Sequence, residues 1–447
     1  MAHTHHGETH EPASSLRTHY SSAVTEALDG QTITLAGWAH EIRDLGKLKF
    51  LVLRDREGRV QVTAKEGVAD SLVIDSLKGV SRESVVVVVG NVVKNAKAPG
   101  GVEVVPSKIT VIASAQSPLP LDVTGKVDAD LDTRINNRFM DVRKPEVMAV
   151  FRIRAKVQEA FREFFLKKKF IEINPPSIIA AASEGGTNLF ALTYFEKEAY
   201  LCQSPQLYKQ MILAGGFDKV FMTVPVFRAE SHNTTKHLNE IYQMDIEKAF
   251  IRDEEGVLEE LEGVTYHIIK KVVEECPQEL KALNRNLEVP KLPLPRVTYD
   301  ECLEILNKKG MKMPWGEDLS SEACHLLKDE FTGPYIIKAW PTKVRAFYSR
   351  PYDDDPERCG AFDLMLGDLE LCSGAQRIHD HDQLVAALKK RGLNPANFEF
   401  YLSAFKYGMP PHGGWSIGSE RITQVLTGVP NIRETVLWPR DRTRLTP

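Results

Sequence analysis

The sequence has few cysteines, no long apolar run and no excess of positive charge. Its six cysteines are widely spaced and include no Cys-x-x-Cys pair, so reduced thiols in a cytoplasm are expected rather than a disulfide framework or a zinc site. No run of about eighteen apolar residues occurs, which excludes a membrane-spanning helix. The formal net charge is −4, so any binding of nucleic acid would depend on local patches.

The chain is long enough for more than one domain. Its 447 residues exceed what one hydrophobic core usually supports, and 43% hydrophobic and 26% charged residues are typical of soluble globular proteins. Residues 1–16 contain four histidines and lack the apolar core of a signal peptide. They are predicted to be a disordered tail, although the histidines could also bind metal opportunistically.

Residues 17–119 read as short strands separated by turns, with no long helical period between them. About five strands in about 100 residues fit a small closed barrel such as the oligonucleotide-binding (OB) fold. Phe50 and Gln61 fall on neighbouring strands, where an aromatic ring and an amide could stack on and hydrogen-bond to unpaired bases. Phe50 could equally belong to the barrel core.

Residues 120–145 lack periodicity and are predicted to be a hinge, and a helix is predicted from Pro145 onward. The following FIEINPPSII predicts a strand that ends at Pro175-Pro176, at a sheet edge. Gln206 and Lys209 are three residues apart in a predicted helix, so they share one of its faces. Residues 251–350 are expected to be mostly amphipathic helices without chemistry.

The stretch 220–250 predicts two strands joined by a polar loop. Arg228 and Glu230 end an apolar face of the first strand, and Gln243, Asp245 and Glu247 share one face of the second. An ordinary hairpin with a solvated face would also fit. However, burying ionisable groups beside hydrophobic strands is costly unless they are paired or bind something. The stretch is therefore a candidate floor of a polar-ligand site.

A second hairpin is predicted around Gly367-Asp368. In a regular hairpin Asp363 would face Cys372, and Glu370 would share a face with Asp363. Diagonal partners lie about 7–8 Å apart, close enough to hold hydrated magnesium. An exposed acidic hairpin is the alternative.

Further along, GGWSIGSER predicts a glycine-bearing strand that leads into a helix. Its glycines would let a flat ligand or a phosphate approach the backbone.

Together these segments resemble an archaeal-type aspartyl-tRNA synthetase of class II. FIEINPP resembles the first class signature, VFRAESHNTTKHLNE the second, and GGWSIGSER with NIRETVLWPRDRTRLTP the third. The likeness covers about residues 17–447. It implies an α+β protein with an OB-fold anticodon-binding barrel at 17–119 and a class II catalytic domain at 146–447, an antiparallel sheet flanked by helices. It also implies ATP and magnesium as cofactors, and a homodimer joined around Pro176.

The resemblance also implies roles for individual residues. Arg228 would hold the ATP α-phosphate, Glu230 the adenine amino group, and Arg421 would stack on adenine as the third catalytic residue. The expected ATP-binding set is Arg228, Glu230, His237, Leu238, Glu370, Gly418 and Arg421. The expected magnesium set is Asp363, Glu370 and Ser373. The expected aspartate-binding set is Ser183, Glu184, Gln206, Lys209, Asp245, Ser373 and Arg377, with Gly185 beside the first two in a closing loop.

Physical chemistry agrees with part of this assignment. Lys209 and Arg377 can hold a side-chain carboxylate, Arg in a bidentate fashion, and Asp245 can take the ammonium. Three departures from the family pattern stand out: Ser416 replaces a usual glycine, Ile241 replaces an aromatic residue of many relatives, and Val89 replaces a glutamate that reads the first anticodon base.

The expected anticodon-binding residues are Phe50, Gln61, His40 and Pro99. Relatives confined to tRNA(Asp) have Trp and Lys where this chain has His40 and Pro99, whereas relatives that charge both tRNA(Asp) and tRNA(Asn) resemble this chain. A non-discriminating enzyme is therefore expected, with an amidotransferase acting on its Asp-tRNA(Asn). The alternatives are a tRNA(Asp)-specific enzyme, an asparaginyl-tRNA synthetase, a regulatory paralogue and a tRNA-independent ligase.

Overall fold

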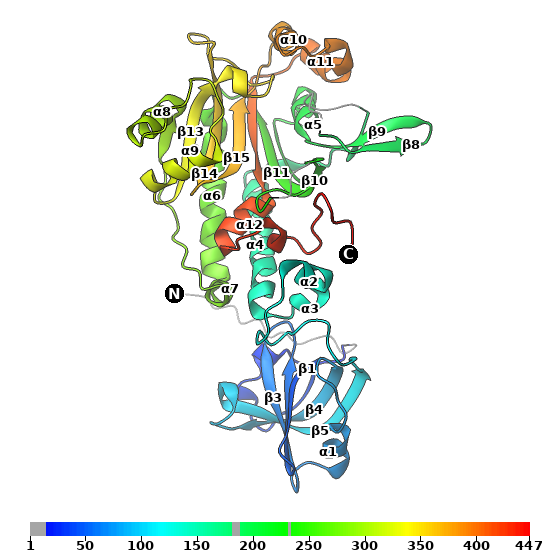
Figure 1. Cartoon of the computed structure of the whole chain (residues 1–447). Helices are drawn as coiled ribbons and strands as arrows, with labels where there is room; N and C mark the ends of the chain where they lie inside the picture. The colour runs from blue at the N-terminus through cyan, green and yellow to red at the C-terminus, as the bar shows by residue number, and fades with distance from the viewer. Residues whose placement is uncertain (1–14, 181–187, 231–233) are drawn as a thin grey trace. The chain divides into compact units, whose positions relative to one another are not determined.

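The computed structural model describes residues 15–180, 188–230 and 234–447 (Figure 1). The chain forms two compact units, residues 1–122 and 123–447. Almost all of the predicted tail, residues 1–16, lies outside the described residues. No helix in the described part of the chain is long and apolar enough to cross a membrane.

The first unit is a closed five-stranded barrel with the strand order β1-β2-β3-β5-β4. Its strands are β1 (Thr32–Asp44), β2 (Leu48–Arg54), β3 (Arg59–Lys65), β4 (Val85–Lys94) and β5 (Val102–Ala113), with helix α1 (Ser71–Ser76) between β3 and β4. Alternate side chains point inward, such as Ile33 and Leu35 on β1 and Val86 and Val88 on β4, and all four are buried. The predicted OB-fold barrel is confirmed.

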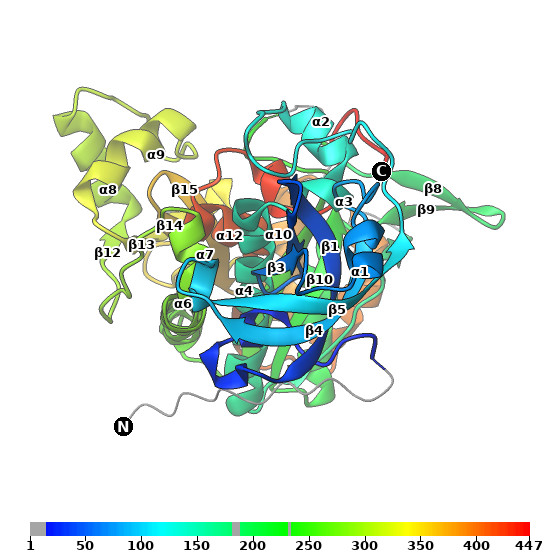
Figure 2. The same cartoon turned by 90° about the horizontal axis from the view of Figure 1, so that it is seen from below.

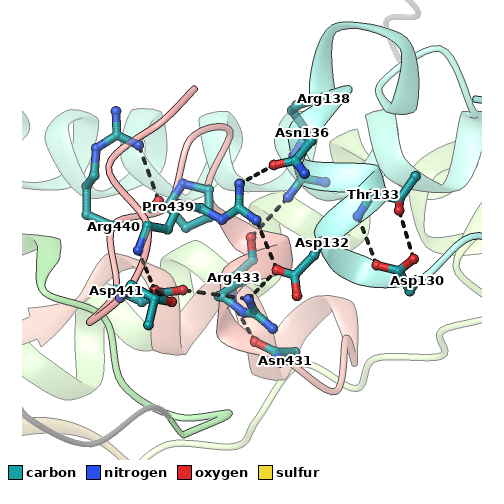
Figure 3. Close-up of polar contacts among 12 residues, drawn as sticks. Asp130, Asp132, Thr133, Asn136, Arg138, Asn431, Arg433, Pro439, Arg440 and Asp441 are labelled. Atoms are coloured by element: carbon teal, nitrogen blue, oxygen red, sulfur yellow. Dashed lines mark hydrogen bonds and ion pairs between the residues drawn. The ribbon is translucent and has the colours of Figure 1, made fainter. Parts of the chain in front are cut away.

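The predicted hinge, residues 120–145, has a different structure from the one expected. It contains α2 (Leu131–Asn136), capped by Asp130, and α3 (Arg138–Asp141). The buried Arg138 pairs with Asp141 at 2.7 Å. It also donates to the backbone carbonyl of Arg433 at 3.1 Å (Figure 3). Ion pairs and backbone contacts hold these short helices together with buried Ile135 and Met140, which the lack of periodicity did not indicate; that the segment acts as a hinge stays a prediction.

The second unit is built on an eight-stranded sheet with the order β12-β13-β14-β15-β16-β11-β10-β6. The strands are β6 (Ile171–Glu172), β10 (Lys219–Phe227), β11 (Glu240–Ala249), β12 (Arg296–Thr298), β13 (Pro334–Pro341), β14 (Arg358–Leu366), β15 (Leu369–Gln376) and β16 (His412–Gly418). In the described part of this sheet, the strands from β13 to β10 pair antiparallel, and the edge strands β6 and β12 pair parallel with their neighbours. The predicted α+β class is confirmed, and β6 ends at the sheet edge as FIEINPP indicated.

Two long helices, α4 (Pro145–Lys167) and α6 (Glu255–Glu275), contact each other and cover one face of this sheet (Figure 1, Figure 2). Phe161 and Phe165 of α4 pack against Phe221 of β10 and Trp415 of β16, with ring centroids 5.7–6.3 Å apart. Because this core fills one face of the sheet, the other face remains for polar side chains.

The remaining elements surround the sheet. They are the small sheet β7 (Ile178–Ile179), β8 (Ala191–Tyr194) and β9 (Lys197–Leu201), and helices α5 (Gln206–Met211), α7 (Pro277–Ala282), α8 (Tyr299–Lys308), α9 (Ser321–Leu327), α10 (His381–Lys390), α11 (Glu399–Lys406) and α12 (Ser419–Thr427). Short 3-10 turns include η3 (Pro99–Gly101), η6 (Thr342–Val344) and η8 (Ile432–Thr435). The region 251–350 is therefore largely helical as predicted, but it also supplies strands β12 and β13.

Candidate active site

Strands β10 and β11 pair as the sequence predicted. Met222 lies opposite Asp245, and Val220 lies opposite Glu247. Met244 and Ile246 point into the core beneath α4 and α6, whereas Asp245 and Glu247 lie on the other face and are buried. Because burial of two carboxylates is unfavourable without partners, the cations around them decide how this face works.

A buried ion network supplies those partners. The Nζ atom of Lys209, from α5, lies 2.9 Å from Asp245 Oδ2 and 3.3 Å from Glu247 Oε2. The Nε atom of Arg377, just after β15, donates to Glu247 Oε1 at 2.9 Å. Burial alone would raise the pKa of Glu247, but Arg377 and Lys209 together hold that pKa below its usual value. Two cations and two carboxylates are thereby balanced.

The position of Lys209 corrects one expectation. Lys209 was expected to hold a substrate carboxylate, but it is fully buried and its Nζ atom also lies 3.2 Å from the backbone oxygens of Ile246 and Trp415. It does not line the cavity, because the two carboxylates of the network already surround it. Its charge acts on the cavity from beneath.

The other described residues of the predicted aspartate set, Gln206, Asp245, Ser373 and Arg377, all line one cavity of ≈ 400 Å³. Asp245 Oδ1 is buried and has no hydrogen-bond partner among the described residues. An unsatisfied buried acceptor of this kind suits the ammonium group of a ligand. Ser183, Glu184 and Gly185 lie outside the described residues.

The same cavity contains every residue of the predicted ATP set: Arg228, Glu230, His237, Leu238, Glu370, Gly418 and Arg421. Arg421, in α12, donates to the backbone oxygen of Glu370 at 2.9 Å and lies 3.7 Å from its carboxylate. Burial and the nearby Arg421 lower the pKa of His237. The cations Arg228, Lys236 and Arg421 suit a ligand with several negative charges.

The acidic hairpin β14–β15 differs from the regular hairpin that was predicted. Leu366 faces Leu369 as expected, but Asp363 faces Ser373 instead of Cys372. A β-bulge at Leu371 adds one residue to β15 and shifts the register. The bulge places Asp363, Glu370 and Ser373 on the same face, which a regular strand could not do.

Arg345, which follows η6, contacts two of these residues. Its Nη1 atom donates to Asp363 Oδ1 at 3.1 Å and to Ser373 Oγ at 3.3 Å, and its guanidinium stacks 3.8 Å from the Trp340 ring. The walls of the cavity partly desolvate Glu370, whose side chain is 45% exposed, and together with the charge of Asp363 this raises the pKa of Glu370 to about 7. A divalent cation would relieve this repulsion, so the acids fit magnesium, with Glu370 as the carboxylate that Arg345 leaves available.

The barrel presents two of the predicted anticodon residues on one face. Phe50 lies opposite Thr63, and Gln61 lies opposite Val52, so Phe50 and Gln61 lie on the same side of β2 and β3. Leu51, rather than Phe50, points into the barrel core. The Gln61 amide donates to Glu103 at 3.0 Å.

The other two anticodon candidates differ from each other. Pro99 begins η3 and is exposed, whereas His40 occupies a bulge in β1 and is buried. Its Nδ1 atom lies 2.9 Å from Arg54 Nη1 and 3.2 Å from Glu83 Oε1. The anticodon set implied that His40 contacts a base directly, but the buried position of His40 does not expose it for such a contact. His40 would therefore influence anticodon binding only indirectly, by its contacts with Arg54 and Glu83.

Comparison with known proteins agrees with this geometry. Residues 130–442 match the family described as tRNA synthetases class II (D, K and N), and residues 33–112 match the OB-fold nucleic acid binding domain. The chain belongs to the class II tRNA synthetases. Within this class, relatives at about 50% identity place the synthetase in the archaeal-type aspartate–tRNA ligase family.

Three relatives of the synthetase illustrate this placement. The aspartate–tRNA(Asp/Asn) ligase of Archaeoglobus fulgidus is 52% identical over 428 residues, covering 96% of this chain and 99% of the relative. The aspartate–tRNA(Asp) ligase of Thermococcus kodakarensis is 52% identical over 436 residues, covering 96% and 100%. The crystal structure of asparaginyl-tRNA synthetase from Pyrococcus horikoshii with asparaginyl-adenylate has a TM-score of 0.91 at 32% identity and covers 96% of this chain and 99% of that one.

Sequence reasoning missed several residues that line the cavity of this synthetase, above all Arg345. The region 251–350 was read as free of chemistry, because no signature includes it. The only local signal was a cation placed between Trp340 and Phe347, just after a strand that ends at Pro341. Glu420 was also missed; it lines the cavity and binds Arg154 of α4 at 2.6 Å.

Proposed function

We propose that this synthetase activates L-aspartate with ATP and transfers it to both tRNA(Asp) and tRNA(Asn). The observation that carries the choice of amino acid is the buried network of Lys209, Asp245, Glu247 and Arg377. Arg377 lines the cavity and can receive a side-chain carboxylate, with Lys209 close beneath, while Asp245 Oδ1 can accept from the α-ammonium. An amide side chain offers no charge to these cations.

The reaction needs alignment and charge neutralisation rather than a covalent enzyme intermediate. The α-carboxylate oxygen of aspartate attacks the α-phosphorus of ATP, the bond from this phosphorus to the bridging oxygen breaks, and pyrophosphate leaves. Arg228 would neutralise charge on the α-phosphate, and Arg421 would stack on adenine. The terminal adenosine hydroxyl of the tRNA then attacks the aspartyl carbonyl carbon of the adenylate, and its proton passes to the adenylate phosphate. The bond from this carbon to the phosphate oxygen breaks, so AMP leaves and the ester is formed.

Magnesium would be held by Glu370 together with Asp363 and Ser373. When bound, it would neutralise the phosphate oxygens. Mg²⁺ commonly uses one or two carboxylates plus substrate phosphates, which matches a site where Arg345 already satisfies Asp363 in part.

The amino acid can be tested by ATP–pyrophosphate exchange with aspartate and with asparagine. We expect exchange with aspartate and little with asparagine. Asparagine-dependent exchange would instead support an asparaginyl-tRNA synthetase, the alternative favoured by the structural likeness to the Pyrococcus horikoshii enzyme.

The choice of tRNA depends on His40 and Pro99. Relatives named for tRNA(Asp) alone and for both tRNAs are equally similar at 52% identity, so overall likeness does not decide it. Losing a bulky Trp and a Lys donor would relax the reading of the third anticodon base. Charging of purified tRNA(Asp) and tRNA(Asn) side by side tests this, and a preference of several hundredfold for tRNA(Asp) would contradict it.

We expect the Asp-tRNA(Asn) product to be converted by an amidotransferase in the same cytoplasm. We also propose that the synthetase is a homodimer. Apolar Ile171 and Ile178, on either side of Pro175-Pro176, are about half exposed in the single chain. Sedimentation of the purified protein at twice the monomer mass would support the dimer, and a monomer mass would contradict it.

A further inference from the structure

A row of buried side chains connects Arg377 to His412, at the start of β16. The Arg377 Nη2 atom donates to Gln206 Oε1 at 3.3 Å, and Gln206 Nε2 donates to Gln210 Oε1 at 3.0 Å. The Gln210 Nε2 atom lies 2.9 Å from His412 Nε2, and the Tyr401 hydroxyl donates to Gln210 Oε1 at 3.1 Å. Each of these residues is at most 5% exposed, so the row is buried and meets the cavity only at Arg377 and Gln206.

The chemistry of the groups fixes the direction of every hydrogen bond in this row. A guanidinium has only donors, so the Gln206 oxygen must face Arg377 and its amide nitrogen must face Gln210. The oxygen of Gln210 then accepts, and its nitrogen donates to His412 Nε2, which must carry a lone pair. The proton of His412 therefore lies on Nδ1, which donates to the Pro410 carbonyl at 2.8 Å.

His412 is the only group in the row whose protonation could reverse this direction. A proton on Nε2 would face the Gln210 NH₂ group, and both glutamine amides would have to turn over. The NH₂ of Gln206 would then face the cationic Arg377, so two donors would meet without an acceptor between them. Burial lowers the pKa of His412 to about 4, so the imidazole remains neutral near pH 7 and the direction is kept.

We propose that His412 is a positioning residue for recognition of the substrate's side-chain carboxylate. Through Gln210 it orients the amide of Gln206, whose oxygen holds one arm of Arg377 while Glu247 holds another. The Gly414 backbone oxygen also accepts from the same Nη2 atom, at 2.9 Å. His412, which does not line the cavity, thus contributes to the position of the guanidinium beside Glu247 and Gly414. This inference rests on the proposed aspartate activation.

Two substitutions of one residue separate this role from a general structural one. His412→Asn retains an N–H near the Nδ1 position but has no acceptor for Gln210, whereas His412→Gln retains an oxygen near the Nε2 position. In ATP–pyrophosphate exchange we expect His412→Asn to raise the KM for aspartate about tenfold or more, because a buried donor loses its partner. The KM for ATP should stay within about twofold, and His412→Gln should recover most of the loss.

Leu306→Ala, in a different core cluster, is the matched control. It should lower thermal stability without separating the two KM values. The inference is overturned if His412→Asn leaves the KM for aspartate within about twofold of the wild type, raises both KM values alike, or is not rescued by His412→Gln. Absence of aspartate-dependent exchange in the wild type would refute the proposed function instead, so the two failures are distinguishable.

Discussion

The cavity has an amino-acid half, around Asp245 and Arg377, and a nucleotide half, around Arg421 and Glu370, and the two halves differ in how their charged side chains are paired and buried. In the amino-acid half, Lys209, Asp245, Glu247 and Arg377 are almost fully buried and neutralise one another. In the nucleotide half, the side chains of Lys236, Arg421 and Glu370 are 38%, 29% and 45% exposed, and their ion pairs are longer, at 3.5–3.7 Å. The charges of the amino-acid half are balanced before any ligand binds, whereas those of the nucleotide half are more exposed and more loosely paired.

This difference follows from what each ligand brings. Aspartate is small and carries both signs of charge, so its recognition needs donors and acceptors fixed in place in a water-free site. ATP carries several negative charges and a metal ion of its own, so partly exposed cations in long ion pairs can turn to its phosphates when it binds. Mutations in the first half should therefore affect stability, and mutations in the second half should affect catalysis.

The largest expected effect on stability is that of Lys209→Met. Removal of the ammonium leaves Asp245 and Glu247 buried without a cation between them, which should lower the free energy of unfolding by about 3–5 kcal/mol. Urea denaturation of the full chain measures this. Lys236→Met, in the nucleotide half, is the matched control and should change stability by less than about 0.5 kcal/mol. Equal losses in the two variants would remove the distinction between the halves.

Arg228→Ala should lower catalysis and leave stability nearly unchanged. Arg228 lines the cavity and its Nε atom has no hydrogen-bond partner among the described residues, so little folding energy depends on it. Loss of one donor that stabilises the transition state typically lowers kcat by a factor of about 10²–10³, which corresponds to about 2.7–4 kcal/mol of activation free energy. Single-turnover adenylate formation measures it, with the exposed Arg252→Ala as the control. A large fall in stability with unchanged kcat would contradict this assignment.

The sequence was sufficient to predict the elements that carry the site. The alternation of side chains on β10 and β11 placed Asp245 and Glu247 on one face, because it depends on local periodicity. The glycine-bearing strand that leads into a helix placed Arg421 in α12, and its expected role came from the family resemblance. The OB barrel was also predicted from strand spacing alone.

Features that depend on tertiary contacts were not predictable. The bulge at Leu371 depends on how β15 fits between β14 and β16, so a regular hairpin gave the wrong partner for Asp363. The sequence predicted that Lys209 shares a helix face with Gln206, but only the folded structure shows that two carboxylates of β11 surround Lys209. Arg345 lies far in sequence from its partner Ser373, and nothing local indicates the pairing.

The smallest expected effect compares two glutamates, Glu247 and Glu370, whose pKa values shift in opposite directions. The cations around Glu247 lower its pKa, so its contribution to stability is present above about pH 4.5 and is lost as the pH falls below that. Partial desolvation in the cavity and the charge of Asp363 raise the pKa of Glu370 to about 7. Its contribution is therefore fully present below about pH 4.5 and is lost as the pH rises through 7.

Urea denaturation at pH 5 and pH 8, without nucleotide or metal, tests these signs. Relative to Glu370→Gln, the wild type should lose less than about 1 kcal/mol between the two values, since the side chain is half exposed. Added Mg²⁺ and ATP should reduce this loss, because the ionised carboxylate then has a cation to bind. A further measurement at pH 4 tests Glu247: relative to Glu247→Gln, the wild type should be less stable there than at pH 8, because the contribution of Glu247 is lost only below about pH 4.5. If the stability contributions of both glutamates changed in the same direction with pH, the charges of the nucleotide half would already be balanced without ligand. The two halves would then not differ.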